Sequence, residues 1–180
     1  MTIICLGWGS LVWNPGSLGL ASGWSPDGPS LPIEFARQSD NGRITLVVTS
    51  GATQIRVLWA VMAAASIHEA IKDLAQRERI REKNAATAIG FWSPTHSGIG
   101  SESAAVGEWA TARNLSGVVW TALRPRFKGK YRTPLEGEVV DYLASLTGDA
   151  RAEAETYCRR APAQIRTPYR AAIEARLGWT

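Results

Sequence analysis

The feature that most constrains the fold is a short apolar run followed at once by two closely spaced glycines. Residues 3–6 read Ile-Ile-Cys-Leu, which is typical of a short buried strand because the run is apolar, begins with two β-branched residues and lacks helical spacing. Gly7 and Gly9 then flank Trp8, and glycine allows both a positive φ and a close approach to the main chain. Successive N–H groups of such a turn can converge on an anion. The stretch predicts either a cradle for a carboxylate or oxyanion, or a tight turn with packed tryptophans.

The residues that follow extend this stretch to Pro15. Residues 7–15 read Gly-Trp-Gly-Ser-Leu-Val-Trp-Asn-Pro. The string resembles the Gly-Tyr-Gly-Ser-Leu-Ile-Trp-Asn-Pro opening of the γ-glutamylcyclotransferase-like superfamily, especially its ChaC branch. Beyond Pro15 the remainder of the ChaC pattern is not found, which favours a divergent branch. Trp8 stands where the motif usually has tyrosine, so an aromatic wall is kept and a hydroxyl is lost.

Length and composition indicate one globular domain over residues 1–180. A chain of 180 residues can bury roughly 70% of its unfolded surface, and the apolar fraction of 45% is ordinary for such a domain. The two cysteines, Cys5 and Cys158, are expected to be free buried thiols. No apolar run approaches the roughly 18–20 residues needed to span a bilayer, and the N-terminus lacks the basic region of a signal peptide. We therefore expect a cytoplasmic protein.

The net charge of +4 comes largely from two runs, residues 77–83 and 124–130. The first alternates both signs, which is typical of a solvated helix face. The second could touch phosphates, but it is short and no nucleic-acid-reading module surrounds it. We expect no nucleic-acid partner and no membrane partner. The sequence does not indicate an oligomeric state.

Hydrophobic periodicity and turn residues predict an α+β fold with antiparallel hairpins early and helices late. Asp40-Asn41-Gly42 is a hairpin signal, and three consecutive strands around it predict a meander. The resemblance implies a small, partly closed β-barrel with flanking helices and a helical C-terminus. The predicted strands are 3–6, 31–39, 43–48, 53–61, 88–92 and 117–122, and the predicted helices are about 66 to 77–81, 104–113, 133–147, 149–160 and 167–177.

Side chains that accept hydrogen bonds from free N–H groups predict where several helices begin. Ser66 and Glu69 form a capping-box pattern, and Thr133-Pro134-Leu135-Glu136 forms another with proline at the first helical position. The other predicted boundaries are Gly148 as a helix end, Asp149 as the next cap, Thr167-Pro168 as the last cap and Gly178 as the last end.

Several kinds of catalytic site are not indicated. With two histidines and no cluster of acidic residues or cysteines, the sequence carries no metal signature, and it has no phosphate-binding loop. We expect no metal and no cofactor. A Ser-His-acid triad would need Ser10 with His96 in the loop 93–101, which stays as a weaker alternative. His68 lies within a predicted helix cap and is expected to be solvated.

The resemblance implies a cyclisation that needs no protein nucleophile. The α-amine of a γ-glutamyl group attacks its own γ-carbonyl, 5-oxoproline forms, and the leaving amine departs. One glutamate takes a proton from the α-ammonium and returns it to the leaving nitrogen, which is general acid–base work. The motif residues are the implied substrate-binding positions: Gly7, Trp8, Gly9, Ser10 and Leu11.

The superfamily's catalytic glutamate follows the central helix, and in ChaC-like chains it stands in an Arg-Glu dipeptide. Arg77-Glu78 matches the spacing from the last helical leucine, whereas Arg81-Glu82 better matches the distance to the next strand. We prefer Glu78 and keep Glu82 as second choice. A carboxylate at a helix C-terminus faces the negative end of the helix dipole, which disfavours its charged form. The alternative is that both glutamates are surface residues.

Arg37 is a further candidate that we infer from strand alternation. If Ile33 and Phe35 face the core, Arg37 follows them on the same side, where a guanidinium needs an anionic partner. A substrate carboxylate or an internal glutamate would serve as that partner.

The resemblance therefore predicts a γ-glutamylcyclotransferase-like enzyme acting on a small γ-glutamyl peptide or amine. The alternative is a non-catalytic module of the same fold that binds a small ligand or a protein.

Overall fold

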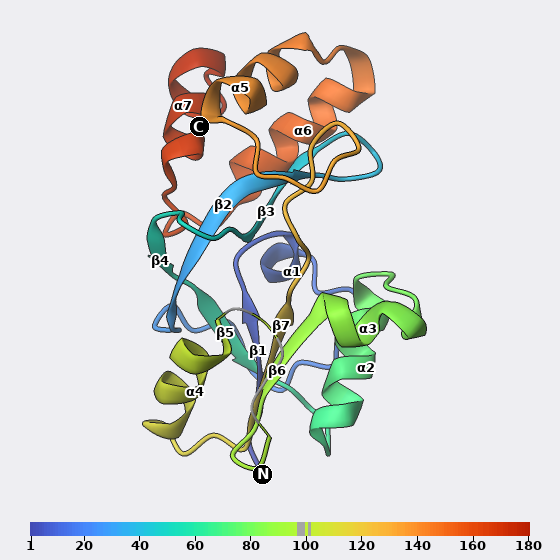
Figure 1. Cartoon of the computed structure of the whole chain (residues 1–180), viewed down its shortest axis with the longest axis vertical. Coiled ribbons are helices and arrows are strands. Elements are labelled where there is room, and N and C mark those ends of the chain that lie inside the picture. Colours follow the sequence, from blue (N-terminus) through green and yellow to red (C-terminus); the bar gives the residue numbers. More distant parts are fainter. Residues whose placement is uncertain (97–99, 101) are drawn as a thin grey trace. The chain divides into compact units, whose positions relative to one another are not determined.

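The computed structural model describes residues 1–96, 100 and 102–180, so part of the predicted loop 93–101 lies outside the described residues. The fold is mixed α+β, as predicted, with two sheets and with helices concentrated late in the chain (Figure 1). Two compact units can be distinguished, and each is made of segments distant in sequence. The first comprises residues 1–7, 14–31 and 56–123, and the second comprises residues 8–13, 32–55 and 124–180. The single domain and the partly closed barrel stay predictions.

The first unit is built on a four-stranded sheet with the predicted N-terminal strand inside it. β1 pairs antiparallel with β5 on one side and parallel with β7 on the other, and all five of its residues are buried. Buried polar main chain must be hydrogen-bonded, and two neighbours satisfy both edges of β1. In order across the sheet the strands are β5 (Leu58–Val61), β1 (Ile3–Gly7), β7 (Gly117–Thr121) and β6 (Ile89–Trp92). The helices of this unit are α2 (Ile67–Arg77), α3 (Glu82–Ala88) and α4 (Ser103–Thr111).

The second unit combines a three-stranded sheet with the C-terminal helices. Its strands, in order, are β3 (Ile44–Val48), β2 (Ser30–Gln38) and β4 (Gln54–Arg56). The helices are α1 (Ser10–Trp13), α5 (Glu136–Ser145), α6 (Gly148–Arg160) and α7 (Pro168–Leu177). α5 packs on α7, and α6 contacts α1 (Figure 1).

The hairpin predicted at residues 40–42 is confirmed. Ser39 and Arg43 close the loop through a bond from Ser39 N–H to Arg43 O of 2.8 Å, and Gly42 N–H donates to Ser39 O at 3.0 Å. Gly42 has φ 84°, the left-handed conformation that follows the turn in a three-residue hairpin loop and that glycine adopts without strain.

The predicted meander is wrong, because residues 53–61 do not form one strand beside β3. β4 pairs on the far side of β2, and β5 joins β1 in the other sheet. The change occurs at Val57, whose N–H donates to Pro29 O and whose carbonyl accepts from Gly28 N–H, both at 3.0 Å. Val57 therefore hydrogen-bonds to the loop before β2 instead of to a neighbouring strand, and this interrupts the predicted strand between β4 and β5.

The alternation expected along β2 also fails. Residues 31–36 are buried on both faces, including Glu34. β2 pairs with β3 through Phe35↔Leu46 and then Arg37↔Thr45, so Ala36 is an extra residue, a β-bulge. Paired residues share a face, and adjacent residues of β3 face opposite ways. The bulge therefore turns Arg37 to the face opposite Phe35, against the prediction.

The helix boundaries are partly as predicted. Ser66 caps α2 by accepting from Glu69 N–H at 3.1 Å, and Thr167 caps α7 by accepting from Arg170 N–H at 3.2 Å. Gly178, with φ 67°, ends α7.

Two predicted boundaries are wrong. α5 begins two residues late, with Leu135 as N-cap, because the Glu138 carboxylate accepts from Leu135 N–H at 2.8 Å and also binds Arg132. Thr147 precedes α6, so Gly148 and Asp149 lie within its first turn. Among the described residues no helix is long and apolar enough to cross a membrane.

Candidate functional site

The glycine-rich motif leaves β1 and forms one helical turn rather than an open loop. β1 ends at Gly7, and residues 10–13 form α1, whose start is closed by a bond from Val12 N–H to Gly9 O of 3.0 Å. Leu11 is buried and Ser10 is half-buried. The N–H groups of a first helical turn point out of the helix, so the geometry suits the predicted anion cradle at Gly9–Leu11. The cradle itself stays a prediction.

Both tryptophans of the motif are packed within the second unit. Trp8 is buried, and its indole N–H donates to Leu46 O at 3.2 Å. The Trp13 ring meets the Tyr157 ring edge-on with centroids 5.3 Å apart. A tight turn with packed tryptophans is therefore present, and it is compatible with an anion cradle on the same main chain. The aromatic wall expected at Trp8 stays a prediction.

Glu78 lies at the end of α2 and is held by its neighbour. The helix ends at Arg77, and Glu78 is the C-cap, with its N–H donating to Leu74 O at 3.0 Å. Arg77 Nη1 pairs with Glu78 Oε1. The two side chains are 11% and 18% exposed, so both are largely withdrawn from solvent while the carboxylate remains reachable.

Arg77 also connects the end of α2 to the motif. Its Nη2 donates to the carbonyl oxygen of Asn14, the eighth of the nine motif residues. The charge of Glu78 reaches β1 as well: burial raises the pKa of the Cys5 thiol, and the Glu78 carboxylate raises it further while Arg77 lowers it. Asn14 follows the glycine turn in sequence, so the bond from Arg77 places the dipeptide beside the segment that leaves the turn.

The backbone after Glu78 is strained. Arg79 has φ 55°, its N–H donates to Gln76 O at 3.1 Å, and Ile80 N–H donates to Ala75 O at 2.8 Å. This pair of bonds is a Schellman motif, in which glycine usually occupies the left-handed position. An arginine there costs roughly 1 kcal/mol or more, because its Cβ crowds the main chain. Two reverse-turn bonds therefore fix the Glu78 backbone despite the strain.

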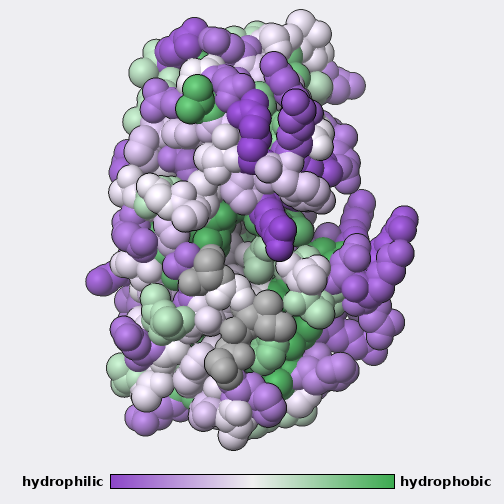
Figure 2. Space-filling model, viewed as in Figure 1, coloured by the Kyte–Doolittle hydropathy of each residue, from purple (hydrophilic) through white to green (hydrophobic). Residues whose placement is uncertain are grey.

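Glu82 is in a different setting, at the first residue of α3. It is exposed, and Arg81 is the N-cap. A carboxylate in the first turn is stabilised by the positive end of the helix dipole, which accounts for Glu82 without a catalytic role. Figure 2 shows hydrophilic side chains projecting where Figure 1 places α3, in agreement with a solvated face.

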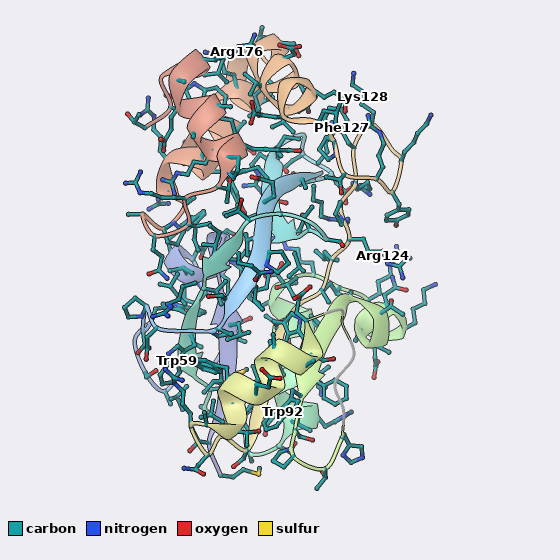
Figure 3. All side chains as sticks on the ribbon, turned by 60° about the vertical axis from the view of Figure 1, so that its left-hand side comes forward. Trp59, Trp92, Arg124, Phe127, Lys128 and Arg176 are labelled. Carbon is teal, nitrogen blue, oxygen red and sulfur yellow. The ribbon has the colours of Figure 1, made fainter. Side chains whose placement is uncertain are left out.

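Arg37 is satisfied by main chain rather than by a carboxylate. Its Nη1 donates to Arg124 O at 2.7 Å, and the neighbouring Arg126 pairs with Asp40. Burial lowers the pKa of Arg37, and the charge of Arg126 lowers it further. Figure 3 shows Arg124 and Lys128 on the basic segment 124–130, pointing away from the ribbon.

The alternative nucleophilic and metal sites gain no support. His68 is exposed in the first turn of α2, and His96 is exposed with Thr95 Oγ1 3.0 Å from its Nδ1. Among the described residues no three His, Cys, Asp or Glu side chains are grouped as a metal site would require.

The sequence reasoning missed one buried carboxylate, Glu34 of β2. It is 3% exposed and accepts a bond from Phe35 N–H at 2.8 Å and one from Tyr169 N–H at 3.4 Å. The Thr167 hydroxyl also donates to it. Burial raises the pKa of Glu34, and these hydrogen bonds oppose the shift. The available signal was a carboxylate inside the apolar run Leu-Pro-Ile-Glu-Phe-Ala.

Comparison with known proteins yields a distant likeness among solved structures. No family model matches the sequence, and no curated protein matches it. Among solved structures, the chain is similar to a yeast γ-glutamyl cyclotransferase specific to glutathione, with a TM-score of 0.48 and 13% identity. The alignment covers 99% of this chain and 98% of that chain. At this TM-score and identity, the likeness assigns neither a fold family nor an activity to this chain.

Proposed function

We propose that this protein is a γ-glutamylcyclotransferase-like enzyme, which cyclises the γ-glutamyl group of a small peptide or amine and releases 5-oxoproline. The observation that carries the proposal is the bond from Arg77 to Asn14 O, which joins the Arg-Glu dipeptide to one residue of the motif within the first unit. The motif and the Arg-Glu dipeptide were each chosen from the sequence, and their proximity is independent support.

Glu78 is the proposed general acid–base. It takes a proton from the substrate's α-ammonium, and the free amine attacks the γ-carbonyl carbon. Collapse of the tetrahedral intermediate breaks the bond to the leaving nitrogen, which receives the proton from Glu78 as it departs, while the ring nitrogen gives its second proton to solvent and becomes the lactam N–H of 5-oxoproline. Arg77 holds Glu78 Oε1, which orients the carboxylate, and the side chain is 18% exposed, so a substrate could reach it.

The motif main chain is the proposed site for negative charge. The N–H groups of Gly9, Ser10 and Leu11 would hold the substrate carboxylate or the oxyanion that develops on the γ-carbonyl. Gly7 and Trp8 shape the turn that presents them. Because the contacts are main-chain, the Ser10 hydroxyl is expected to contribute only about 0.5–1.5 kcal/mol to binding. Arg37 is not carried into this proposal, because the Arg124 carbonyl and the bulge account for its position.

A screen of γ-glutamyl compounds for 5-oxoproline release tests the proposal. Glutathione, a γ-glutamyl amino acid and a γ-glutamylamine cover the classes of leaving group. We expect release from at least one of them by the wild type and loss of that release in Glu78→Gln. Binding of 5-oxoproline without turnover of any compound would reject the enzyme and favour the non-catalytic binding module. Neither binding nor turnover would reject both.

A further inference from the structure

A tyrosine hydroxyl from α6 lies directly under the glycine turn. Tyr157 is 5% exposed, and its hydroxyl accepts the N–H of Leu46 at 3.2 Å. The carbonyl of Leu46 accepts the indole N–H of Trp8 at 3.2 Å. The main-chain N–H and C=O of Leu46 therefore link Tyr157 to Trp8 of the motif. β3 is an edge strand of its sheet, so both main-chain groups of Leu46 are available to side chains on its open side.

The same hydroxyl leaves no room for a side chain at position 9. A Cβ on Gly9 would lie 2.6 Å from the Tyr157 hydroxyl oxygen, whereas the next nearest atom, Cζ, would be at 3.7 Å. The first distance is an overlap and the second is ordinary contact. The hydroxyl cannot easily withdraw, because Trp13 and Phe35 meet the Tyr157 ring edge-on at 5.3 and 6.3 Å.

We propose that Tyr157 is the positioning residue of the motif: its hydroxyl sets the turn at Gly9, and it is the reason that position 9 is glycine. The usual alternative is that a glycine in such a turn allows the ligand to approach. The two explanations differ in one consequence. If the hydroxyl is the reason, removing it should make alanine acceptable at position 9.

The proposal concerns activity only through the proposed function, whereas its structural consequence can be measured without a substrate. Tyr142 provides a matched control for Tyr157, because the hydroxyl of each tyrosine lies next to a glycine of the second unit, Gly42 and Gly9 respectively. Tyr142 donates its hydroxyl to Gly42 O at 2.7 Å, in the β2–β3 hairpin. Tyr142→Phe therefore removes a comparable hydroxyl away from the motif.

The experiment compares Gly9→Ala, Tyr157→Phe, their double variant and Gly9→Ala/Tyr142→Phe by thermal unfolding and amide hydrogen exchange. We expect Gly9→Ala to lower Tm most. The double variant with Tyr157→Phe should recover to the Tm of Tyr157→Phe alone, whereas the one with Tyr142→Phe should not recover. The Leu46 amide should exchange about two- to tenfold faster in Tyr157→Phe, as loss of one neutral hydrogen bond implies.

Activity gives a second readout if the wild type turns over a γ-glutamyl compound. Tyr157→Phe should raise KM about two- to tenfold with kcat little changed, and Tyr142→Phe should leave both unchanged. Failure of Tyr157→Phe to restore the Tm of Gly9→Ala would overturn the proposal. Restored Tm without restored kcat/KM would also overturn it, because the ligand would then be what requires glycine. A wild type without activity would reject the proposed function and leave the Tm comparison to decide on Tyr157.

Discussion

Two carboxylates withdrawn from solvent, Glu78 and Glu34, are held by opposite kinds of partner. Glu78 is 18% exposed and pairs with the guanidinium of Arg77. Glu34 is 3% exposed and is held by the Thr167 hydroxyl and two main-chain N–H groups. The first is a charge with a charged partner and a path to solvent. The second is a buried acid with neutral donors at the start of α7.

The difference separates a group suited to chemistry from one suited to structure. A carboxylate that exchanges protons with a substrate must be reachable, and Glu78 is. Glu34 uses both oxygens on the β2 and α7 main chain and on the α7 N-cap, so moving it would break the start of that helix. Burial raises the pKa of Glu34, yet inaccessibility makes it a poor candidate base. A shifted pKa alone would therefore have pointed to Glu34, which a substrate cannot reach.

The largest expected effect is on activity, in Glu78→Gln. Glutamine keeps the shape of the side chain but cannot accept and return the proton, so kcat should fall about 10²–10⁴-fold. The free energy of unfolding should change much less than in a Glu34 variant, because one ion pair with a path to solvent is all that is lost. The rate of 5-oxoproline release and urea unfolding measure the two quantities.

Glu82→Gln is the matched control for Glu78→Gln, since it removes the same charge from an exposed position four residues later. It should leave kcat unchanged and alter stability by about 0.5 kcal/mol or less. If Glu82→Gln abolished activity and Glu78→Gln did not, the base would be Glu82 and the mechanism would stand. Full activity in both would remove the carboxylate mechanism.

The next effect is on stability, in Glu34→Ala. The substitution leaves the Phe35 and Tyr169 N–H groups and the Thr167 hydroxyl without their acceptor, at a cost on the order of 3 kcal/mol. Urea unfolding measures the loss. Activity per folded molecule should stay close to that of the wild type, and a fall as large as that of Glu78→Gln would contradict the structural role of Glu34.

A smaller effect is a pH dependence of stability that comes from Glu34. Because the pKa of Glu34 is raised in the folded protein, the folded state binds its proton more tightly than the unfolded state does. The stability that protonated Glu34 contributes is then fully present below the pKa of this group in the unfolded chain, about 4.3. It is lost as the pH rises through the higher pKa of Glu34 in the folded protein. The stability difference between wild type and Glu34→Gln, measured by urea unfolding from acid to neutral pH, should fall across that window. A difference independent of pH would reject this account.

The smallest effect concerns the backbone that carries Glu78. Arg79→Gly removes the strain of a positive φ at a non-glycine residue and should raise the free energy of unfolding by about 1 kcal/mol or less. The Schellman bonds that orient Glu78 remain in the variant, so kcat should not change. Thermal unfolding together with the rate of 5-oxoproline release measures both, and destabilisation would show that Arg79 makes a contact worth more than the strain.

Local signals in the sequence determined much of the secondary structure. The Ser66 and Thr167 caps, the hairpin at residues 40–42 and the end of α7 at Gly178 were all predicted. Each depends on hydrogen bonds or a backbone conformation within a few residues. The motif and the Arg-Glu dipeptide were likewise visible in the sequence, although nothing local could show that Arg77 reaches Asn14, 63 residues away.

Tertiary structure alone decided which groups are buried together. Glu34 is joined to Thr167 across 133 residues, and Leu46 to Tyr157 across 111. The bulge at Ala36 reversed the face of Arg37, and bonds from Val57 to the preceding loop sent β5 to the other sheet. The alternation of apolar residues along a strand indicates that one of its faces is buried. Which strand pairs with it depends on residues distant in the chain. For the same reason nothing in the sequence around Gly9 indicates that the Tyr157 hydroxyl, 148 residues later in the chain, lies against it.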